Sequence, residues 1–226
     1  MKESPAVLHL DAHHAVLLKP AGISVHGKSR QTLQNQLRLG LAEALGIPAG
    51  GDRLVIVNRI DHATRGIVVV AWSHDAETWL TSRWESFSKT YHAWMMGRLE
   101  TPRGNCFMPL DGKAARSAFQ TLGHRSWPVH GEASLVEWSL HSGRTHQLRQ
   151  HAAAMGHPIV GDPVYAPEPR FSGKGLHLQG TAFRWLPPGS RTWEEVHCPP
   201  SKRFRRADER HFQPVAPSAF LPLFVP

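Results

Sequence analysis

Two continuous runs of apolar residues around a short polar loop constrain the fold of this chain more than any other feature of its sequence. The runs cover residues 54–60 and 67–72 and are rich in valine and isoleucine, which is typical of strands buried on both faces. The loop between them, residues 61–66, places the Asp61 carboxylate between Arg59 and Arg65. Because adjacent cations keep a carboxylate ionised and a strand end holds it rigidly, Asp61 is a candidate nucleophile. The alternative is a loop aspartate that makes only turn hydrogen bonds.

Periodicity in the rest of the chain predicts a mixture of helices and strands without an internal repeat. Leucines at every fourth position predict a helix over 31–46. Further helices are predicted over 75–87 and 144–155, and further strands over 91–99, 117–122, 133–141 and 176–185. Because strands and helices do not alternate regularly, the predicted class is α+β, with a mixed, mostly antiparallel central sheet and flanking helices.

The charge balance of the chain indicates what kind of partner it binds. The chain has 26 lysines and arginines against 18 acidic residues, a net charge of +8 with histidine neutral. Such a surface suits a polyanion, either nucleic acid or an anionic membrane. The two cysteines, Cys106 and Cys198, are too far apart for a CxxC pair, which argues against a disulfide scaffold and fits a reducing compartment. With no signal-like start and no long apolar run, we expect a soluble cytoplasmic protein.

The composition changes after residue 186. Eight prolines fall in the last 40 residues, around the basic run Lys202–Arg206. We therefore expect a catalytic or binding domain over 1–186 and an irregular extension over 187–226, packed on that domain or trailing from it. The basic run is either a contact for a polyanion or a solvated stretch of charge.

Five segments of the chain, in the same order, resemble the motifs of the RluA-type RNA pseudouridine synthases. Lys19–Gly22 is similar to their early KPxG turn, and Arg59–Gly66 to the RLDxxTSG motif that holds their catalytic aspartate. Residues 89–97 are similar to their KxYxAxxxG strand. The longest and most specific matches are GRTHQLRQH at 143–151 and GHPIVGDPVY at 156–165.

The resemblance implies the pseudouridine synthase catalytic fold, with a cleft across the sheet, and the isomerisation of uridine to pseudouridine in RNA. Asp61 is then the catalytic aspartate, which either attacks C1′ or abstracts a sugar proton. By the same analogy Tyr91 packs against the target uracil, and Arg149 pairs with Asp61. By analogy Leu148 forms part of the apolar pocket wall. The other candidate substrate-binding residues are the cations Arg59, Arg65 and Arg144, which are placed to contact RNA phosphate.

Each of these roles has a structural alternative. Tyr91 and Leu148 are also residue types expected in a core, and Arg149 is also compatible with a solvated helix cation. Arg59 either engages RNA or forms a structural ion pair. Two departures from the motif stand out: Asn58 replaces the usual histidine, and Arg65 replaces the usual serine. Neither removes the aspartate, so we expect the chemistry to survive and substrate preference to change.

The resemblance also sets expectations about partners and cofactors. The isomerisation is redox-neutral, so no cofactor is implied. His146 and His151 are five residues apart and do not align on one helical face, and we expect no metal site. The expected partner is ribosomal or transfer RNA, bound by a monomer without membrane association. The chain is too short at its N-terminus for the S4 RNA-binding domain of many relatives, so we expect a catalytic domain with its tail.

Two other functions compete with this one. A catalytically silent RNA-binding protein on the same fold is the first alternative, and the joint presence of Asp61, Tyr91 and Arg149 speaks against it. A hydrolase that works with two carboxylates is the second. It is disfavoured because the motif loop holds no second acidic residue, and Asp162 belongs to a turn-like Gly-Asp-Pro.

Overall fold

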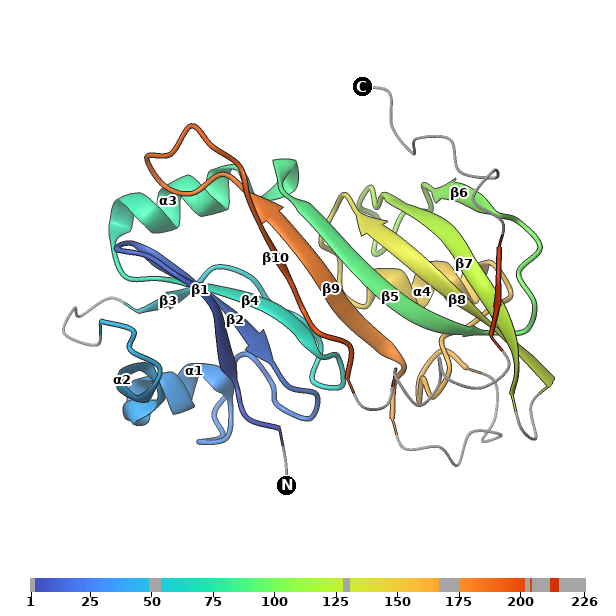
Figure 1. The fold of residues 1–226 in the computed structure, drawn as a ribbon, viewed down its shortest axis with the longest axis horizontal. Helices are drawn as coiled ribbons and strands as arrows, with labels where there is room; N and C mark the ends of the chain where they lie inside the picture. The colour runs from blue at the N-terminus through green and yellow to red at the C-terminus, as the bar shows by residue number, and fades with distance from the viewer. Residues whose placement is uncertain are drawn as a thin grey trace. The chain divides into compact units, whose positions relative to one another are not determined.

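The computed structural model describes residues 3–48, 54–127, 131–166, 175–201, 204 and 212–215. It forms two compact units, whose helices and strands are labelled in Figure 1. Unit 1 comprises Met1–Lys89 and Gly180–Pro199, and unit 2 comprises Thr90–Gln179 and Pro200–Pro226. Strands β5 (Ser88–Met96) and β9 (Leu178–Trp185) each begin in one unit and end in the other.

Unit 1 is built on a four-stranded antiparallel sheet with the order β1-β2-β4-β3. Its strands are β1 (Ala6–Leu10), β2 (His14–Lys19), β3 (Val55–Ile56) and β4 (Gly66–Ala71). In the central pair, His14 lies opposite Ala71 and Lys19 opposite Gly66. Strand β10 (Glu194–His197) pairs with the part of β9 that belongs to unit 1, so the predicted extension contains regular structure.

The central strands β2 and β4 are buried on both faces, as the apolar run 67–72 predicts for β4. Val16 and Leu18 of β2 pack in a cluster with helix α3 (His74–Ser82) and with Phe183 and Trp185 of β9. The alternate residues of β2, Ala15 and Leu17, pack on the opposite face with the helical segment that begins at Leu33. Because successive side chains of a strand point to opposite faces of the sheet, β2 contributes residues to two hydrophobic cores.

The continuous helix expected over 31–46 is wrong. The segment is divided into α1 (Leu33–Gln36), a π-helical turn η1 (Leu37–Leu41) and α2 (Ala42–Ala44). Thr32 caps the first turn by accepting from the Asn35 amide. Gly40 has φ of +115°, a conformation that side chains disfavour, and it interrupts the regular helix. Every fourth position still carries an apolar residue, so periodicity alone could not reveal the break.

The strand expected over 54–60 is also shorter than predicted. It ends at Ile56. One further backbone hydrogen bond runs from the Val57 amide to the Val69 carbonyl, and the Asn58 side chain then replaces the backbone as the hydrogen-bonding partner of β4. Asn58 Oδ1 accepts from the Val69 amide at 2.8 Å, and Asn58 Nδ2 donates to the Ile67 carbonyl at 3.1 Å. Asp61 therefore lies in the loop that follows this side-chain anchor and not at the end of a continuous strand.

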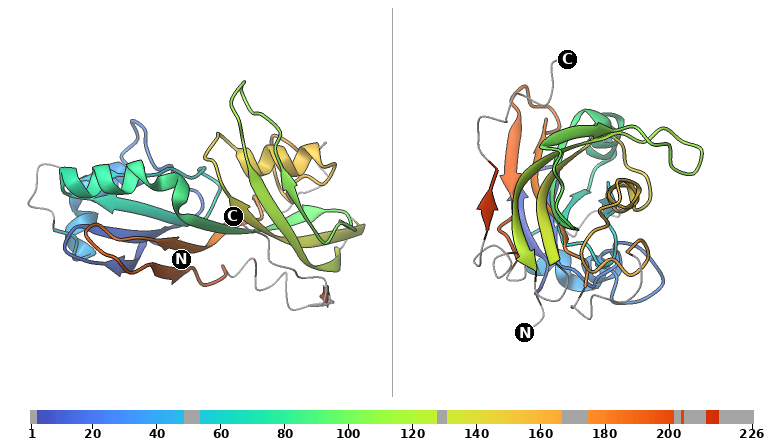
Figure 2. Two further views of the ribbon diagram at one scale, coloured as in Figure 1. Left: turned by 90° about the horizontal axis from the view of Figure 1, so that it is seen from above. Right: turned by 90° about the vertical axis from the view of Figure 1, so that its right-hand side faces the viewer.

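Unit 2 is a curved antiparallel sheet with the order β5-β8-β7-β11, to which β6 adds by pairing with β7. Its other elements are β6 (Arg103–Cys106), β7 (Ser117–Trp127), β8 (Gly131–Leu140), α4 (Gln147–Ala154) and β11 (Gln213–Pro214). Figure 2 shows α4 on the concave side of this sheet. The class is α+β with mostly antiparallel sheets, as predicted. Among the described residues, no helix has both the length and the apolar character required to cross a membrane.

Candidate active site

The loop that carries Asp61 is held by backbone hydrogen bonds within unit 1. Asp61 is half-buried, and its carbonyl accepts from the Thr64 amide at 3.1 Å, which closes a tight turn. The next residue, His62, accepts from the Gly22 amide at 2.7 Å. Gly22 has φ of +85°, so the turn that resembles KPxG requires glycine at this point. Two sequence motifs that lie 40 residues apart are thus joined directly.

Lys19 is the last residue of β2, directly before this turn, and was not among the predicted site residues. It is completely buried, and its Nζ donates to the carbonyls of Pro20 at 2.8 Å and Ile23 at 2.7 Å. Burial lowers the pKa of Lys19 to about 8, and the negative charge of Asp61 opposes this shift. The structure therefore brings a buried ammonium close to the predicted catalytic carboxylate. The only sequence signal for this role was the KPxG resemblance itself.

The two arginines that flank Asp61 have different environments. Arg59 is exposed, so its side chain is accessible to a ligand. Arg65 is 6% exposed and forms an ion pair with Glu3, with Nη2 2.8 Å from Oε1. It also donates to the Pro199 carbonyl. These contacts favour a structural role for Arg65 over the predicted contact with substrate.

The remaining predicted site residues lie in unit 2. Tyr91 is half-buried on β5, where it faces Trp138 of β8 in the strand register. Leu148 and Arg149 are both buried near the start of α4, at 4% exposure each. The solvated-cation alternative for Arg149 is therefore wrong. Because Asp61 belongs to unit 1, its convergence with Tyr91 and Arg149 stays a prediction.

Arg149 has a buried acidic partner that sequence reasoning had set aside. Its Nε and Nη2 donate to Asp162 Oδ2 and Oδ1 at 2.7 and 2.8 Å. Asp162 Oδ1 also accepts from the amides of Val164 and Tyr165. Burial alone raises the pKa of Asp162, but the hydrogen bonds from Arg149 and the two amides outweigh it, and the pKa is lowered. Asp162 thus fixes the guanidinium while shaping its own turn.

A second buried network fixes the start of α4. Gln147 donates through Nε2 to the Arg116 carbonyl and the Ser117 hydroxyl, and its Oε1 accepts from Ser142 and from the Arg144 amide. The Arg144 side chain is half-buried, and its Nε donates to the Ala114 carbonyl at 3.0 Å. The GRTHQLRQH motif is therefore a scaffold that positions arginine side chains.

The GHPIVGDPVY segment runs alongside β5. The Met96 amide donates to the Pro158 carbonyl at 2.9 Å, and the Val160 amide donates to the Trp94 carbonyl at 2.8 Å. Gly161 has φ of +74°, and a Cβ at this position would lie 2.3 Å from the Gly175 carbonyl oxygen. Only glycine fits at this position, which explains the Gly-Asp pair at the end of the motif.

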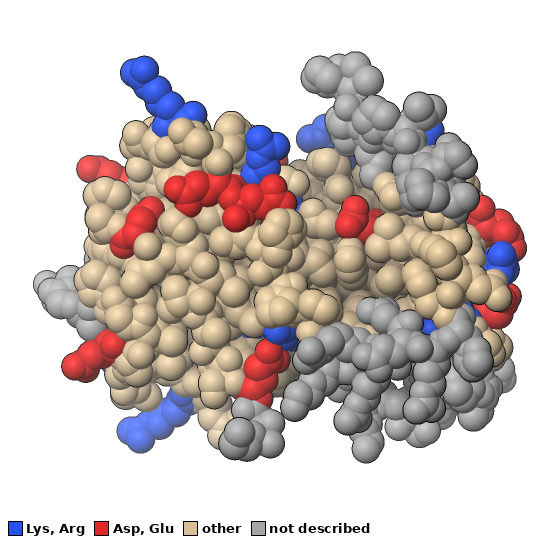
Figure 3. All heavy atoms as spheres, viewed as in Figure 1, with Lys and Arg blue, Asp and Glu red and all other residues tan. Residues whose placement is uncertain are grey.

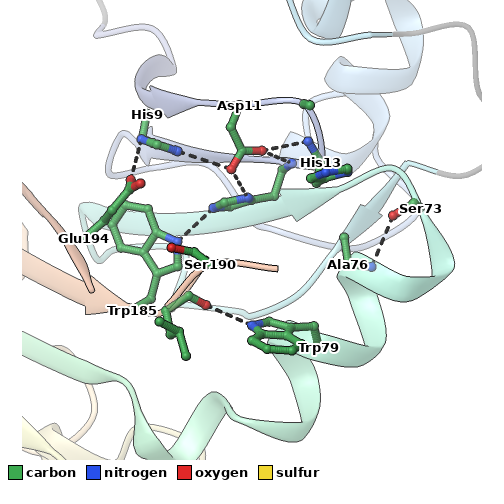
Figure 4. Close-up of polar contacts among 12 residues, drawn as sticks. His9, Asp11, His13, Ser73, Ala76, Trp79, Trp185, Ser190 and Glu194 are labelled. Carbon is green, nitrogen blue, oxygen red and sulfur yellow. Dashed lines mark hydrogen bonds and ion pairs between the residues drawn. The ribbon is translucent and has the colours of Figure 1, made fainter. Parts of the chain in front are cut away.

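One cluster of side chains in unit 1 has the composition of a metal site, and Figure 4 labels two of its members, His9 and Asp11. The possible ligand atoms of His9, Asp11 and His14 all lie within 4.8 Å of one another. However, the Trp185 indole donates to His14 Nε2 at 2.9 Å, and an indole N–H can only donate. In neutral His14 the hydrogen is then on Nδ1, which lies 2.9 Å from Asp11 Oδ2. This arrangement leaves His14 no lone pair for a metal ion.

The face drawn in Figure 3 shows no continuous basic patch among the described residues. Acidic side chains form a row on this face, and basic ones are scattered. Of the basic run at 202–206, the four cationic residues lie outside the described residues. The described Phe204 is buried and packs with Trp94 and Val160.

The motifs and their placement define a member of a known enzyme family. Residues 13–154 match the model of the RNA pseudouridylate synthase family, and the chain belongs to it. The match includes the Asp61 loop, Tyr91 and Arg149. The family predicted from the five motifs is therefore confirmed.

Individual relatives agree with this assignment. The chain is 35% identical over 202 residues to an uncharacterized RNA pseudouridine synthase of Chloroflexus aurantiacus, covering 80% of this chain and 61% of the relative. It is 34% identical over 194 residues to the ribosomal large subunit pseudouridine synthase D of Zymomonas mobilis, covering 77% and 59%. It is 31% identical over 215 residues to the ribosomal large subunit pseudouridine synthase C of Vibrio cholerae, covering 85% of this chain and 65% of the relative. The chain thus spans less than two thirds of these relatives.

Solved structures show the same fold. The human RNA pseudouridylate synthase domain containing 4 aligns with a TM-score of 0.73 at 21% identity, covering 91% of this chain and 92% of that one. The human RNA pseudouridylate synthase domain containing 1 aligns with a TM-score of 0.72 at 21% identity, covering 94% and 89%.

Proposed function

We propose that this chain is an RNA pseudouridine synthase that isomerises specific uridines. The observation that carries the proposal is the family match, which includes an intact Asp61 in a loop anchored by Gly22 and Asn58. The N1–C1′ bond breaks, the uracil rotates, and C5 bonds to C1′. The reaction is an isomerisation, so no atom is gained or lost.

Asp61 is the catalytic residue in this proposal. It acts either by attack of its carboxylate on C1′ or by abstraction of a sugar proton to give a glycal, and both routes require the ionised form. The buried ammonium of Lys19 interacts electrostatically with Asp61.

The roles of the other residues follow from the motif match. Tyr91 packs against the target uracil, and Arg149 pairs with the Asp61 carboxylate. Leu148 lines the apolar side of the uracil pocket. Arg59 and Arg144 contact the RNA backbone. A uridine stacked in RNA cannot rotate its base within an active site that reaches both C1′ and C5, so the enzyme extrudes the nucleotide before reaction.

The proposed substrate is ribosomal RNA of the large subunit. Two of the relatives are named for that activity, and their identity to this chain is 31% and 34%. Transfer RNA is the alternative substrate. Recognition relies on single-stranded or looped uridines, since the narrow major groove of an RNA helix hides its bases.

The test is to incubate the purified chain with transcripts of ribosomal and transfer RNA and to analyse the nucleosides released by digestion. Pseudouridine supports the proposed function, free uracil indicates a hydrolase, and RNA binding without either product indicates a silent binding protein. Mapping pseudouridines in total RNA with and without this gene then identifies the modified position.

A further inference from the structure

The Asp61 loop is anchored at its C-terminal end by a residue that departs from the family motif. Arg65 stands where serine is usual, and its side chain is only 7% exposed. Its Nε lies 3.0 Å from both carboxylate oxygens of Glu3, and Nη2 donates to Glu3 Oε1 at 2.8 Å. Nη1 donates to the Pro199 carbonyl at 2.8 Å. One side chain thus ties the loop to segments 62 and 134 residues away in the sequence.

The backbone at Arg65 is fixed as well. Its carbonyl accepts from the Gly180 amide at 2.9 Å, and a Cβ on Gly66 would lie 3.0 Å from the Gly180 nitrogen. Only three residues separate Arg65 from Asp61, and the hydrogen bond from the Thr64 amide to the Asp61 carbonyl closes that interval. A displacement of Arg65 therefore also displaces Asp61.

The two partners of the ion pair differ in burial, so the requirement for the pair comes from Arg65 and not from Glu3. Arg65 is buried, whereas the Glu3 side chain is 45% exposed. A buried cation is costly unless it is paired, so Arg65 favours the loop conformation in which Glu3 neutralises it. A serine at this position would impose no such requirement.

We infer that Arg65 is a positioning residue whose ion pair with Glu3 holds the Asp61 loop in the conformation that turnover requires. The inference rests on the proposed catalytic function of Asp61. It differs from the role expected from the sequence, in which Arg65 is a cation that contacts RNA. Its consequence is a separation of effects: loss of the pair lowers kcat and leaves the affinity for RNA unchanged.

The test compares Glu3→Gln, Arg65→Ser and the double variant with the wild type on a responsive RNA. We expect each single change to lower kcat about 10-fold or more, because small misplacements of a catalytic group are costly, with KM unchanged. The double variant should be little worse than either single one, since both remove the same interaction. Hydrogen exchange at the Thr64 amide should accelerate in all three. Arg65→Lys keeps the charge and should recover part of the lost kcat.

Arg98→Ser is the matched control, because it removes exposed ion pairs with Glu100 and Glu132 elsewhere in the chain. It should change neither kcat nor exchange at Thr64. Wild-type kcat in folded Glu3→Gln overturns the inference, and so does a raised KM with unchanged kcat, which would assign Arg65 to RNA. If the wild type itself makes no pseudouridine, the proposed function fails. Unchanged exchange at Thr64 in Glu3→Gln would independently refute the anchor.

Discussion

Arg149 and Asp162 form a buried bidentate ion pair that joins the first turn of α4 to the turn after Gly161, with donor–acceptor distances of 2.7 and 2.8 Å. The Asp162 side chain is completely buried and that of Arg149 is 5% exposed. The two motifs that looked most specific in the sequence, 143–151 and 156–165, are therefore parts of one structure. A predicted catalytic cation is oriented by a residue from the other motif.

Replacing Asp162 with asparagine should destabilise the protein by about 3 kcal/mol or more, because it removes the charge that faces a buried guanidinium. Activity should fall with stability, since Arg149 would lose its fixed orientation. Glu100→Gln, which breaks an exposed pair with Arg98, should cost less than about 1 kcal/mol. Denaturant titrations of both variants measure the difference. Equal losses would show that burial does not strengthen the Arg149–Asp162 pair.

Asp61→Asn should abolish pseudouridine formation. The amide keeps the size of the side chain but can neither attack C1′ nor abstract a sugar proton, so the loss is expected under both mechanisms. Thermal melting should change little, and RNA binding should persist because phosphate contacts supply much of the affinity. Retained turnover in this variant would refute the mechanism. Joint loss of folding and binding would instead assign Asp61 a structural role.

Stability should depend on pH through His14. Burial lowers its pKa to about 4, whereas the unfolded chain titrates near the ordinary value of 6.5. The unfolded state therefore binds the extra proton, so stability is greatest above pH 6.5, falls as the pH is lowered to 4, and then levels off. A difference of this size corresponds to about 3 kcal/mol.

The control for that prediction is His14→Gln, which cannot ionise but still offers an acceptor to the Trp185 indole. Urea titrations at pH 7, 6, 5 and 4 should show a smaller loss of stability on acidification in the variant than in the wild type. Parallel pH profiles would mean that His14 is not the group responsible.

RNA affinity should fall with salt, and the individual arginines should differ in their share of this dependence. Arg144→Ala should reduce the slope of log affinity against log salt by about one, as expected for a lost phosphate contact. The exposed Arg59 should behave in the same way. Arg65→Ser should leave the slope unchanged because its guanidinium is buried against Glu3. Filter-binding titrations from low to high salt measure these slopes, and an affinity indifferent to salt would contradict the expectations for Arg144 and Arg59. A reduced slope in Arg65→Ser would contradict the third.

The sequence predicted the parts of the fold that depend on local pattern. The apolar run after Asp61 became the buried strand β4, and alternation along 133–141 matched β8. The helix break at Gly40 and the early end of β3 were missed for a common reason. Both depend on one residue, a glycine with positive φ or the Asn58 amide that substitutes for backbone, and such effects do not alter hydrophobic periodicity.

Residues of the candidate site could be predicted from the sequence only where they belong to a recognisable family motif. Asp61, Tyr91 and Arg149 came from the family resemblance, whereas the contacts that hold them were not visible. The Lys19 ammonium is held by the carbonyls of Pro20 and Ile23 in the following turn. The charge of Arg65 is neutralised by Glu3, which lies 62 residues away in the sequence. Asp162 looked like an ordinary turn residue because its partner, Arg149, lies 13 residues earlier on a helix. Pairings of this kind are decided by tertiary packing.

The division of the chain into two units also determines which truncated forms of the protein can fold. Unit 1 is discontinuous, since Gly180–Pro199 returns to complete a core begun before residue 90. Phe183 and Trp185 arrive in that core only after all of 90–179 has been translated. A nascent chain therefore cannot finish its first unit early, and stop codons placed anywhere before residue 186 should yield fragments that chaperones and proteases recognise as incomplete.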